Sequence, residues 1–162
     1  MERRGVYELA RMGILTAVLF MGQVALAFLP NVEIVSLLVI LYTLFFGKKV
    51  FGILFAFVFL EGFLYGFGMW WFSYLYIWNL LALVVLLLPR SDSAFFWSMV
   101  SGFFGLFFGA LCALPYLAIG GWSAALSYWT AGLGFDLVHC AGNVVLCLCL
   151  FRPLYRLLEK LC

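Results

Sequence analysis

The feature that most restricts the fold of this chain is almost uninterrupted hydrophobicity. Apolar stretches begin near Ala10 and continue nearly to Phe151, broken only by short turns. The total is far longer than the apolar core of one cleaved signal peptide. Hydrophobic residues make up 68% of the chain and charged residues 10%, whereas soluble domains are roughly half apolar and a quarter charged. We therefore predict an all-α integral membrane protein.

Turn signals divide the apolar sequence into six expected spans within a single transmembrane domain, residues 1–162. Proline, glycine or basic residues separate most of the spans, as in Gly47-Lys48-Lys49 and Pro89-Arg90. We expect Pro115 to kink the fifth span, because proline removes a helical hydrogen bond. Residues 120–130 are expected to form a connection rich in Trp and Tyr. The six expected spans are about 10–29, 32–46, 50–67, 71–88, 94–119 and 131–151.

The basic residues sort to one side of this six-span bundle. They are Arg3, Arg4, Arg11, Lys48, Lys49, Arg90, Arg152, Arg156 and Lys160. The positive-inside rule makes that side cytoplasmic, with both termini inside the cell. A miscounted span would divide the basic residues between the two sides, so their sorting supports the count. The formal charges left at the outer side are Glu33, Glu61 and Asp136.

The expected sixth span carries a polar stripe within the sequence GFDLVHCAGNVV. Asp136, His139 and Asn143 are spaced i, i+3 and i+7, so on a helix they share one face. An ionisable group near the bilayer centre costs roughly 2.5 kcal/mol or more and normally faces protein or water. The stripe therefore predicts the wall of a solute pocket open to the outside.

Other polar and aromatic residues fall near the same outer mouth. The residues we expect to contact the solute, besides the stripe, are Asn31, Glu33, Glu61, Trp71, Tyr74, Asn79, Trp122 and Trp129; Tyr65, Trp70 and Tyr128 lie nearby. Such a set suits a ring-bearing solute that forms hydrogen bonds. Two simpler interpretations stay open, because Trp and Tyr also form interfacial belts and His139 could bond a neighbouring helix.

The sequence lacks the motifs of several kinds of catalytic chemistry. The chain has one histidine and no HExxH pair, so zinc hydrolysis is unsupported. Its glycine-rich segments lack the Lys-Ser/Thr of a phosphate-binding loop, and no nucleophile elbow surrounds a serine. The five cysteines form no CxxC pair, and the net charge of +2 gives no sign of nucleic-acid binding. We predict no catalytic residue, no metal site and no enzyme activity.

Small residues mark a second type of surface. Ala10, Gly13 and Ala17 lie close to one stripe of the first span, where small side chains let another helix approach closely in lipid. We predict a contact with a partner helix there. Other small-residue stripes, such as Gly102, Gly105 and Gly109, are expected to pack within the bundle.

The whole pattern resembles the substrate-binding S-component of an energy-coupling-factor (ECF) vitamin transporter. The stretches that carry the resemblance are ARMGILTAVLFMGQVALAFLPNVEIVSLLVILYTLFFG and GFDLVHCAGNVVLCLCLFRPLYRLLEKL. The resemblance implies a multi-pass protein of a bacterial plasma membrane that captures a vitamin or related micronutrient. It also implies a transmembrane coupling protein, met by Ala10, Gly13 and Ala17, and two cytoplasmic ATPases that hydrolyse ATP, with no cofactor in this chain. The Ala-xxx-Ala pattern of the family is not reproduced, since Ile14 follows Ala10 at i+4.

Two other functions remain as hypotheses. The chain could be an integral membrane enzyme or assembly factor that acts on a lipid-linked substrate through Asp136 and His139, or a purely structural subunit. For the transport function, we expect a neutral or weakly charged ring-bearing vitamin, such as cobalamin.

Overall fold

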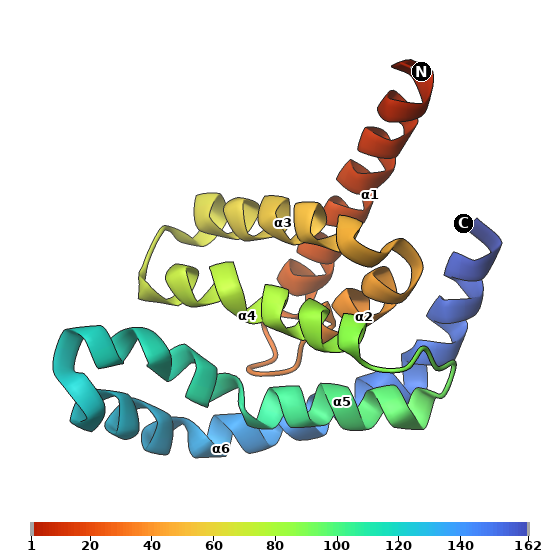
Figure 1. Cartoon of the computed structure of the whole chain (residues 1–162). Helices are drawn as coiled ribbons and strands as arrows, with labels where there is room; N and C mark the ends of the chain where they lie inside the picture. The colour runs from red at the N-terminus through yellow and green to blue at the C-terminus, as the bar shows by residue number, and fades with distance from the viewer. Residues whose placement is uncertain (1, 162) are drawn as a thin grey trace.

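All regular secondary structure in the described part of the chain is helical, as the sequence predicts. The structure is a computed structural model that describes residues 2–161, and the side chains of residues 5–161; this part of the chain has no strand. The helices are α1 (Glu2–Leu26), α2 (Val35–Phe46), the short 3-10 helix η1 (Gly47–Lys49), α3 (Val50–Tyr65), α4 (Met69–Leu87), α5 (Ala94–Leu106) and α6 (Phe108–Leu161) (Figure 1).

Within residues 2–161, four helical stretches are long and apolar enough to cross a membrane. They are Gly5–Leu26, Val35–Tyr65, Met69–Leu87 and Ala94–Leu161. The second stretch contains both α2 and α3, and the fourth contains both α5 and α6. The finding fits a membrane protein.

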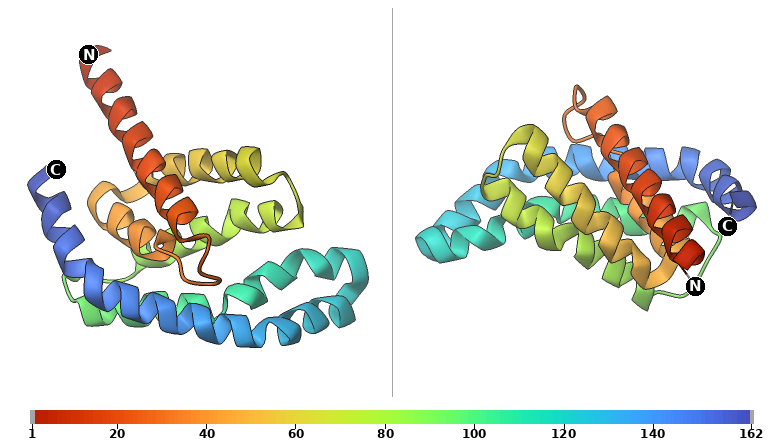
Figure 2. Two further views of the ribbon diagram at one scale, coloured as in Figure 1. Left: turned by 180° about the vertical axis from the view of Figure 1, so that it is seen from behind. Right: turned by 90° about the horizontal axis from the view of Figure 1, so that it is seen from above.

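The long helix α6 reverses direction at two glycines. Gly120 and Gly121 have non-helical backbone angles, and Gly121 has φ +66°, a region that glycine occupies at little cost. The two arms of α6 run back beside each other from this turn (Figures 1 and 2). The expected connection over 120–130 is thus a two-residue turn, and the returning helix starts before the expected span 131–151.

The backbone angles stay helical at Pro115, where the sequence predicts a kink, and the expected span 94–119 breaks at Phe107 instead. Proline has no N–H to donate to the carbonyl four residues earlier, which here belongs to Leu111. The Tyr76 hydroxyl from α4 donates to this Leu111 oxygen at 2.5 Å. The hydrogen bond from a neighbouring helix satisfies the carbonyl, so the backbone stays helical through Pro115.

Helix α2 forms the centre of the bundle. Every residue from Val35 to Thr43 is buried, and α2 contacts α1, α3, α4, α5 and α6. A helix that is apolar on all sides belongs in a core. The expected span 32–46 is short because α2 lies inside protein rather than against lipid along its whole length.

The basic segments gather at one end of the bundle. Both termini, η1 and the connection 88–93 lie toward the right in Figure 1, whereas the α3–α4 turn and the Gly120–Gly121 turn lie toward the left. The second view in Figure 2 shows the same division. Lys49 of η1 forms an ion pair with Glu8 of α1 at 2.6 Å.

Helix α1 packs on α3 along one face and leaves another face open. Ala10, Gly13 and Ala17 are all exposed on that open face. A Cβ atom added at Gly13 would meet nothing within 4 Å. The small-residue stripe is therefore part of the surface of this chain.

Candidate functional site

A cavity of about 290 Å³ lies between the α1–α2 loop (27–34) and the helices that face it. Asn31 in this loop adopts φ +58°, a left-handed conformation that Asn tolerates better than most residues. The cavity is lined by Gln23, Leu26, Ala27, Leu29, Pro30, Asn31, Val32, Glu33, Glu61, Tyr65, Trp70, Tyr74, Trp78, Phe108 and His139.

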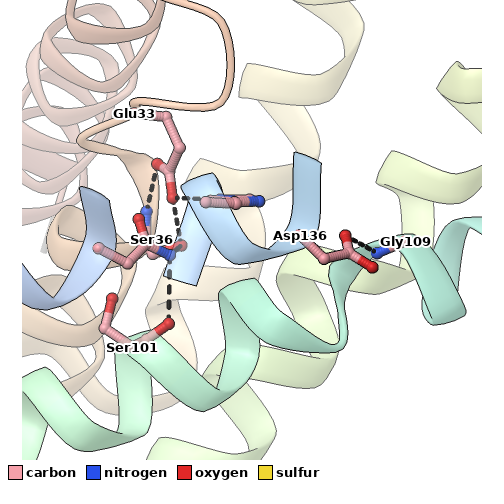
Figure 3. Close-up of polar contacts among 7 residues, drawn as sticks. Glu33, Ser36, Ser101, Gly109 and Asp136 are labelled. Atoms are coloured by element: carbon pink, nitrogen blue, oxygen red, sulfur yellow. Dashed lines mark hydrogen bonds and ion pairs between the residues drawn. The ribbon is translucent and has the colours of Figure 1, made fainter. Parts of the chain in front are cut away.

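Glu33 is fixed by hydrogen bonds at both carboxylate oxygens (Figure 3). The Ser36 backbone N–H donates to Oε2 at 2.8 Å, and the Ser36 hydroxyl donates to Oε1 at 2.5 Å. His139 Nε2 lies 3.1 Å from Oε1. Because Ser36 is in the first turn of α2, Glu33 satisfies a free N–H and places negative charge at the positive end of the helix dipole.

Asn143 extends this network into the core. Its Nδ2 atom donates to the Ser36 hydroxyl and to the Ser101 carbonyl, both at 3.2 Å. The polar chain therefore joins α2, α5 and α6. Both His139 and Asn143 are buried, so this part of the α6 stripe points inward, as the spacing predicts. Asn143 lies behind the cavity wall rather than in it.

Asp136 serves the start of α6 in a similar way. Its Oδ1 atom accepts a hydrogen bond from the Gly109 N–H at 2.8 Å (Figure 3), two residues after the break at Phe107. A Cβ atom at Gly109 would lie 2.5 Å from Oδ2 of Asp136, so the close approach requires glycine. The Oδ2 atom itself is buried and has no hydrogen-bond partner within residues 2–161.

A second cavity, of about 510 Å³, lies beside Asp136. It shares Asn31 and Phe108 with the first cavity and is otherwise lined by α6. Gly109, Cys112, Tyr128, Ala131, Gly132, Phe135 and Asp136 complete its wall.

Glu61 differs from the other two acids. Its side chain lines the first cavity and only 2% of the residue is exposed. The buried Oε1 atom has no hydrogen-bond partner in the described part of the chain. An unpaired carboxylate oxygen in an apolar bundle is costly, so Glu61 is the lining residue with the most to gain from a ligand.

One face of α4 supplies an aromatic wall to the first cavity. Trp70, Tyr74 and Trp78 are spaced by four residues, and successive ring centroids are 5.1 and 5.4 Å apart. Phe108 continues the wall, 5.6 Å from Trp78 and 4.8 Å from the His139 ring. The pairs are tilted or edge-to-face, which is a favourable geometry for aromatic rings.

The structure brings together some of the expected site residues and separates others. Asn31, Glu33, Glu61, Tyr74 and His139 line the first cavity, and Asp136 lines the second. Four expected contacts, Trp71, Asn79, Trp122 and Trp129, line neither of these cavities, and Asn143 lies beneath the first.

Helical phase explains why two of these residues point elsewhere. Trp71 and Asn79 each follow a wall residue by one position, which turns the side chain by about 100°. Trp71 instead donates to the Val58 carbonyl at 2.9 Å, and Asn79 donates to the Leu75 carbonyl of its own helix at 2.7 Å.

The other two belong to the returning arm of α6. Trp122 follows the glycine turn and is 81% exposed. The Trp129 indole N–H is buried without a hydrogen-bond partner among residues 2–161. The aromatic belt interpretation suits Trp122 better than a place in the site.

Sequence reasoning missed three lining residues with informative positions. Trp78 could have been found from Tyr74 by the i+4 rule. Phe108 and Gln23 carry no comparable signal, because their places depend on the break at Phe107 and on the path of the loop after α1.

No group of three or more His, Cys, Asp or Glu side chains in the described range is arranged to hold a metal ion. Comparison of the chain with protein-family models, with curated proteins and with solved structures finds no match. The functional interpretation therefore depends on the cavity, its polar groups and the distribution of charge.

Proposed function

We propose that this chain is a membrane-embedded substrate-binding subunit of the ECF S-component type, which captures a vitamin or related micronutrient at the outer face of the cell membrane. The observation that carries the proposal is the first cavity, which an aromatic wall and Glu61 line together, with one Glu61 oxygen that has no partner in the described chain. Tyr65 and Trp70 of that cavity flank the α3–α4 turn, at the end of the bundle away from the basic segments.

The proposed topology has six crossings. Two of the four apolar helical stretches fold back once, at η1 and at Gly120–Gly121, so each supplies two crossings. The positive-inside rule then places η1, the 88–93 connection and both termini in the cytoplasm. In this orientation the α3–α4 turn and the acids of the two cavities belong to the outer half.

The proposed uptake needs partners, because binding alone cannot concentrate a solute. The chain has no phosphate-binding loop, so in this proposal two cytoplasmic ATPases hydrolyse ATP and a transmembrane coupling protein transmits the work. The exposed stripe of Ala10, Gly13 and Ala17 supports a close helix contact with that coupling protein.

The size of the cavity favours a small ligand. A volume of about 290 Å³ is at the lower end of the roughly 300–1,000 Å³ typical of ligand pockets. A solute with one or two rings suits this volume better than a corrinoid such as cobalamin. The α1–α2 loop, which forms one side of the cavity, would cover such a solute.

The proposal is tested by mass spectrometry of small molecules that co-purify with the detergent-solubilised chain. We expect one solute to be retained by the wild type and by a control variant at the other end of the bundle, Lys160→Ala, and lost from His139→Ala. Recovery of no solute, or equal recovery from all three proteins, would contradict the proposal.

The same preparations separate the alternatives. Chemical conversion of a lipid-linked substrate, reduced in the Asp136→Ala and His139→Ala variants, would support the membrane enzyme. A structural subunit would retain no solute, and the same substitutions would change stability alone.

A further inference from the structure

The first cavity has an electrostatic character that the proposed function leaves undefined. Glu33 and His139 face each other in it at 3.1 Å, and both oxygens of Glu33 are bonded. Glu61 brings a further acid, whose buried Oε1 has no partner within residues 2–161. Among the side chains that the structure describes, no Lys or Arg lines the cavity. The lining therefore carries an acidic group that nothing else in the described chain balances.

The aromatic wall strengthens the same preference. Trp70, Tyr74, Trp78 and Phe108 form a continuous set of rings along the cavity. The face of an aromatic ring attracts a cation within about 6 Å, and Trp does so best. Aromatic cages recognise quaternary ammonium ligands in this way, and here Glu61 adds an acid to the same lining.

Two more residues of the lining each carry a buried polar atom that restricts the ligand further. The Gln23 Oε1 atom is buried without a partner, and so is the Trp78 indole N–H, in the described part of the chain. The Gln23 oxygen accepts a hydrogen bond, and the indole N–H donates one. A complementary ligand presents at least one N–H or O–H donor and at least one acceptor.

We infer that the solute captured by this cavity is an organic monocation with one or two rings, whose positive group lies between Glu61 and the aromatic wall of α4. The inference rests on the proposed binding function and defines the charge of its ligand. It narrows the sequence-based expectation of a neutral or weakly charged solute to one with a positive charge. An anionic ligand would find no described basic side chain in the lining to pair with.

The inference is tested with three probes that share one ring system and differ in charge. They are 2-naphthylmethylammonium, 2-naphthylmethanol and 2-naphthoate, titrated calorimetrically into the detergent-solubilised full chain at neutral pH. We expect the ammonium to bind at least tenfold more tightly than the alcohol, and the carboxylate to bind more weakly than both.

Two variants assign the preference to Glu61. In Glu61→Gln the tenfold advantage of the ammonium over the alcohol should disappear. In Glu159→Gln, which removes an acid near the C-terminus of α6, the advantage should persist. The wild-type ranking of the probes needs no variant, so the test holds even where Glu61→Gln does not fold.

Equal or tighter binding of the alcohol or the carboxylate would overturn the inference, and so would binding of none of the three probes. Retention of the ammonium preference in Glu61→Gln would overturn it as well. The proposed function is judged separately by co-purification. A retained solute that is neutral or anionic would support the binding function and contradict only the inferred positive charge of the ligand.

Discussion

Glu33 and Glu61 line the same cavity, yet their carboxylates have opposite surroundings. Both oxygens of Glu33 accept hydrogen bonds, from Ser36 and His139. Glu61 has a buried oxygen with no partner in the described chain. A buried carboxylate that is fully bonded contributes to the fold, whereas one that is left unpaired costs stability. The two acids therefore separate the structural part of the site from the part available to a ligand.

Asp136 is intermediate between these two acids. One of its oxygens accepts from the Gly109 N–H, and the other is buried without a partner in the described range. Asp136 and Glu33 each serve the start of a helix that begins within the bundle. The comparison thus gives a graded series, in which the cost of removing an acid should follow the number of its bonded oxygens.

The largest effect in this series is expected for Glu33→Ala. The substitution removes the cap of α2 and leaves His139 and the Ser36 hydroxyl without their acceptor. Breaking a buried pair by removing one partner costs about 3 to 5 kcal/mol. The free energy of unfolding is measured by titration with SDS in mixed micelles, with Glu159→Ala as a control. A loss below about 1 kcal/mol would show that the network is not structural.

Gly109→Ala tests the close contact between Gly109, at the start of α6, and Asp136, on the returning arm of the same helix. The added Cβ would lie 2.5 Å from one carboxylate oxygen and 2.7 Å from the other, so either the acid or the backbone must move. We expect a loss of about 1 to 3 kcal/mol, the usual cost of overpacking. The matched control is Gly13→Ala, where the methyl group meets nothing within 4 Å. Equal effects at the two glycines would contradict the contact.

The outlines of the fold could be predicted from the sequence because apolar length and charge sorting act over whole segments. All-helical structure is confirmed, and α3 and α4 begin and end within two residues of the expected spans 50–67 and 71–88. The break at Phe107 was missed, and the connection expected over 120–130 is only the two-residue turn at Gly120–Gly121. The break and the helical backbone at Pro115 depend on tertiary contacts: Asp136 satisfies an N–H after the break, and Tyr76 satisfies the carbonyl that Pro115 leaves free.

The site was predictable in composition and less so in geometry. Spacing alone indicated that Asp136, His139 and Asn143 face inward, and all three are buried. The same spacing could not show that Glu33 crosses to His139, because 106 residues separate the two in the sequence. An error of one residue in helical phase also directed attention to Trp71 instead of Trp70.

Asp136→Ala is expected to lower the free energy of unfolding less than Glu33→Ala does. The variant removes one hydrogen bond to the start of α6 and also removes an unpaired buried oxygen, so the two contributions partly cancel. Loss of a helix-capping side chain typically costs about 0.5 to 2 kcal/mol. The same SDS titration should therefore place Asp136→Ala between Glu33→Ala and the wild type. A loss as large as that of Glu33→Ala would break the proposed grading by bonded oxygens.

The smallest effect on stability is expected for Glu61→Ala. Its buried oxygen bonds to nothing in the described chain, so its removal relieves a desolvation cost while it deletes a little packing at a cavity wall. We expect the free energy of unfolding to change by less than about 1 kcal/mol, and an increase would fit equally well. The SDS titration should then rank Glu33→Ala as the least stable of the three variants. Glu61→Ala should stay folded and lose its preference for the naphthylmethylammonium probe. If Glu61→Ala instead unfolds as readily as Glu33→Ala, the carboxylate has a structural role, and unpaired polar atoms in this cavity do not mark the place of a ligand.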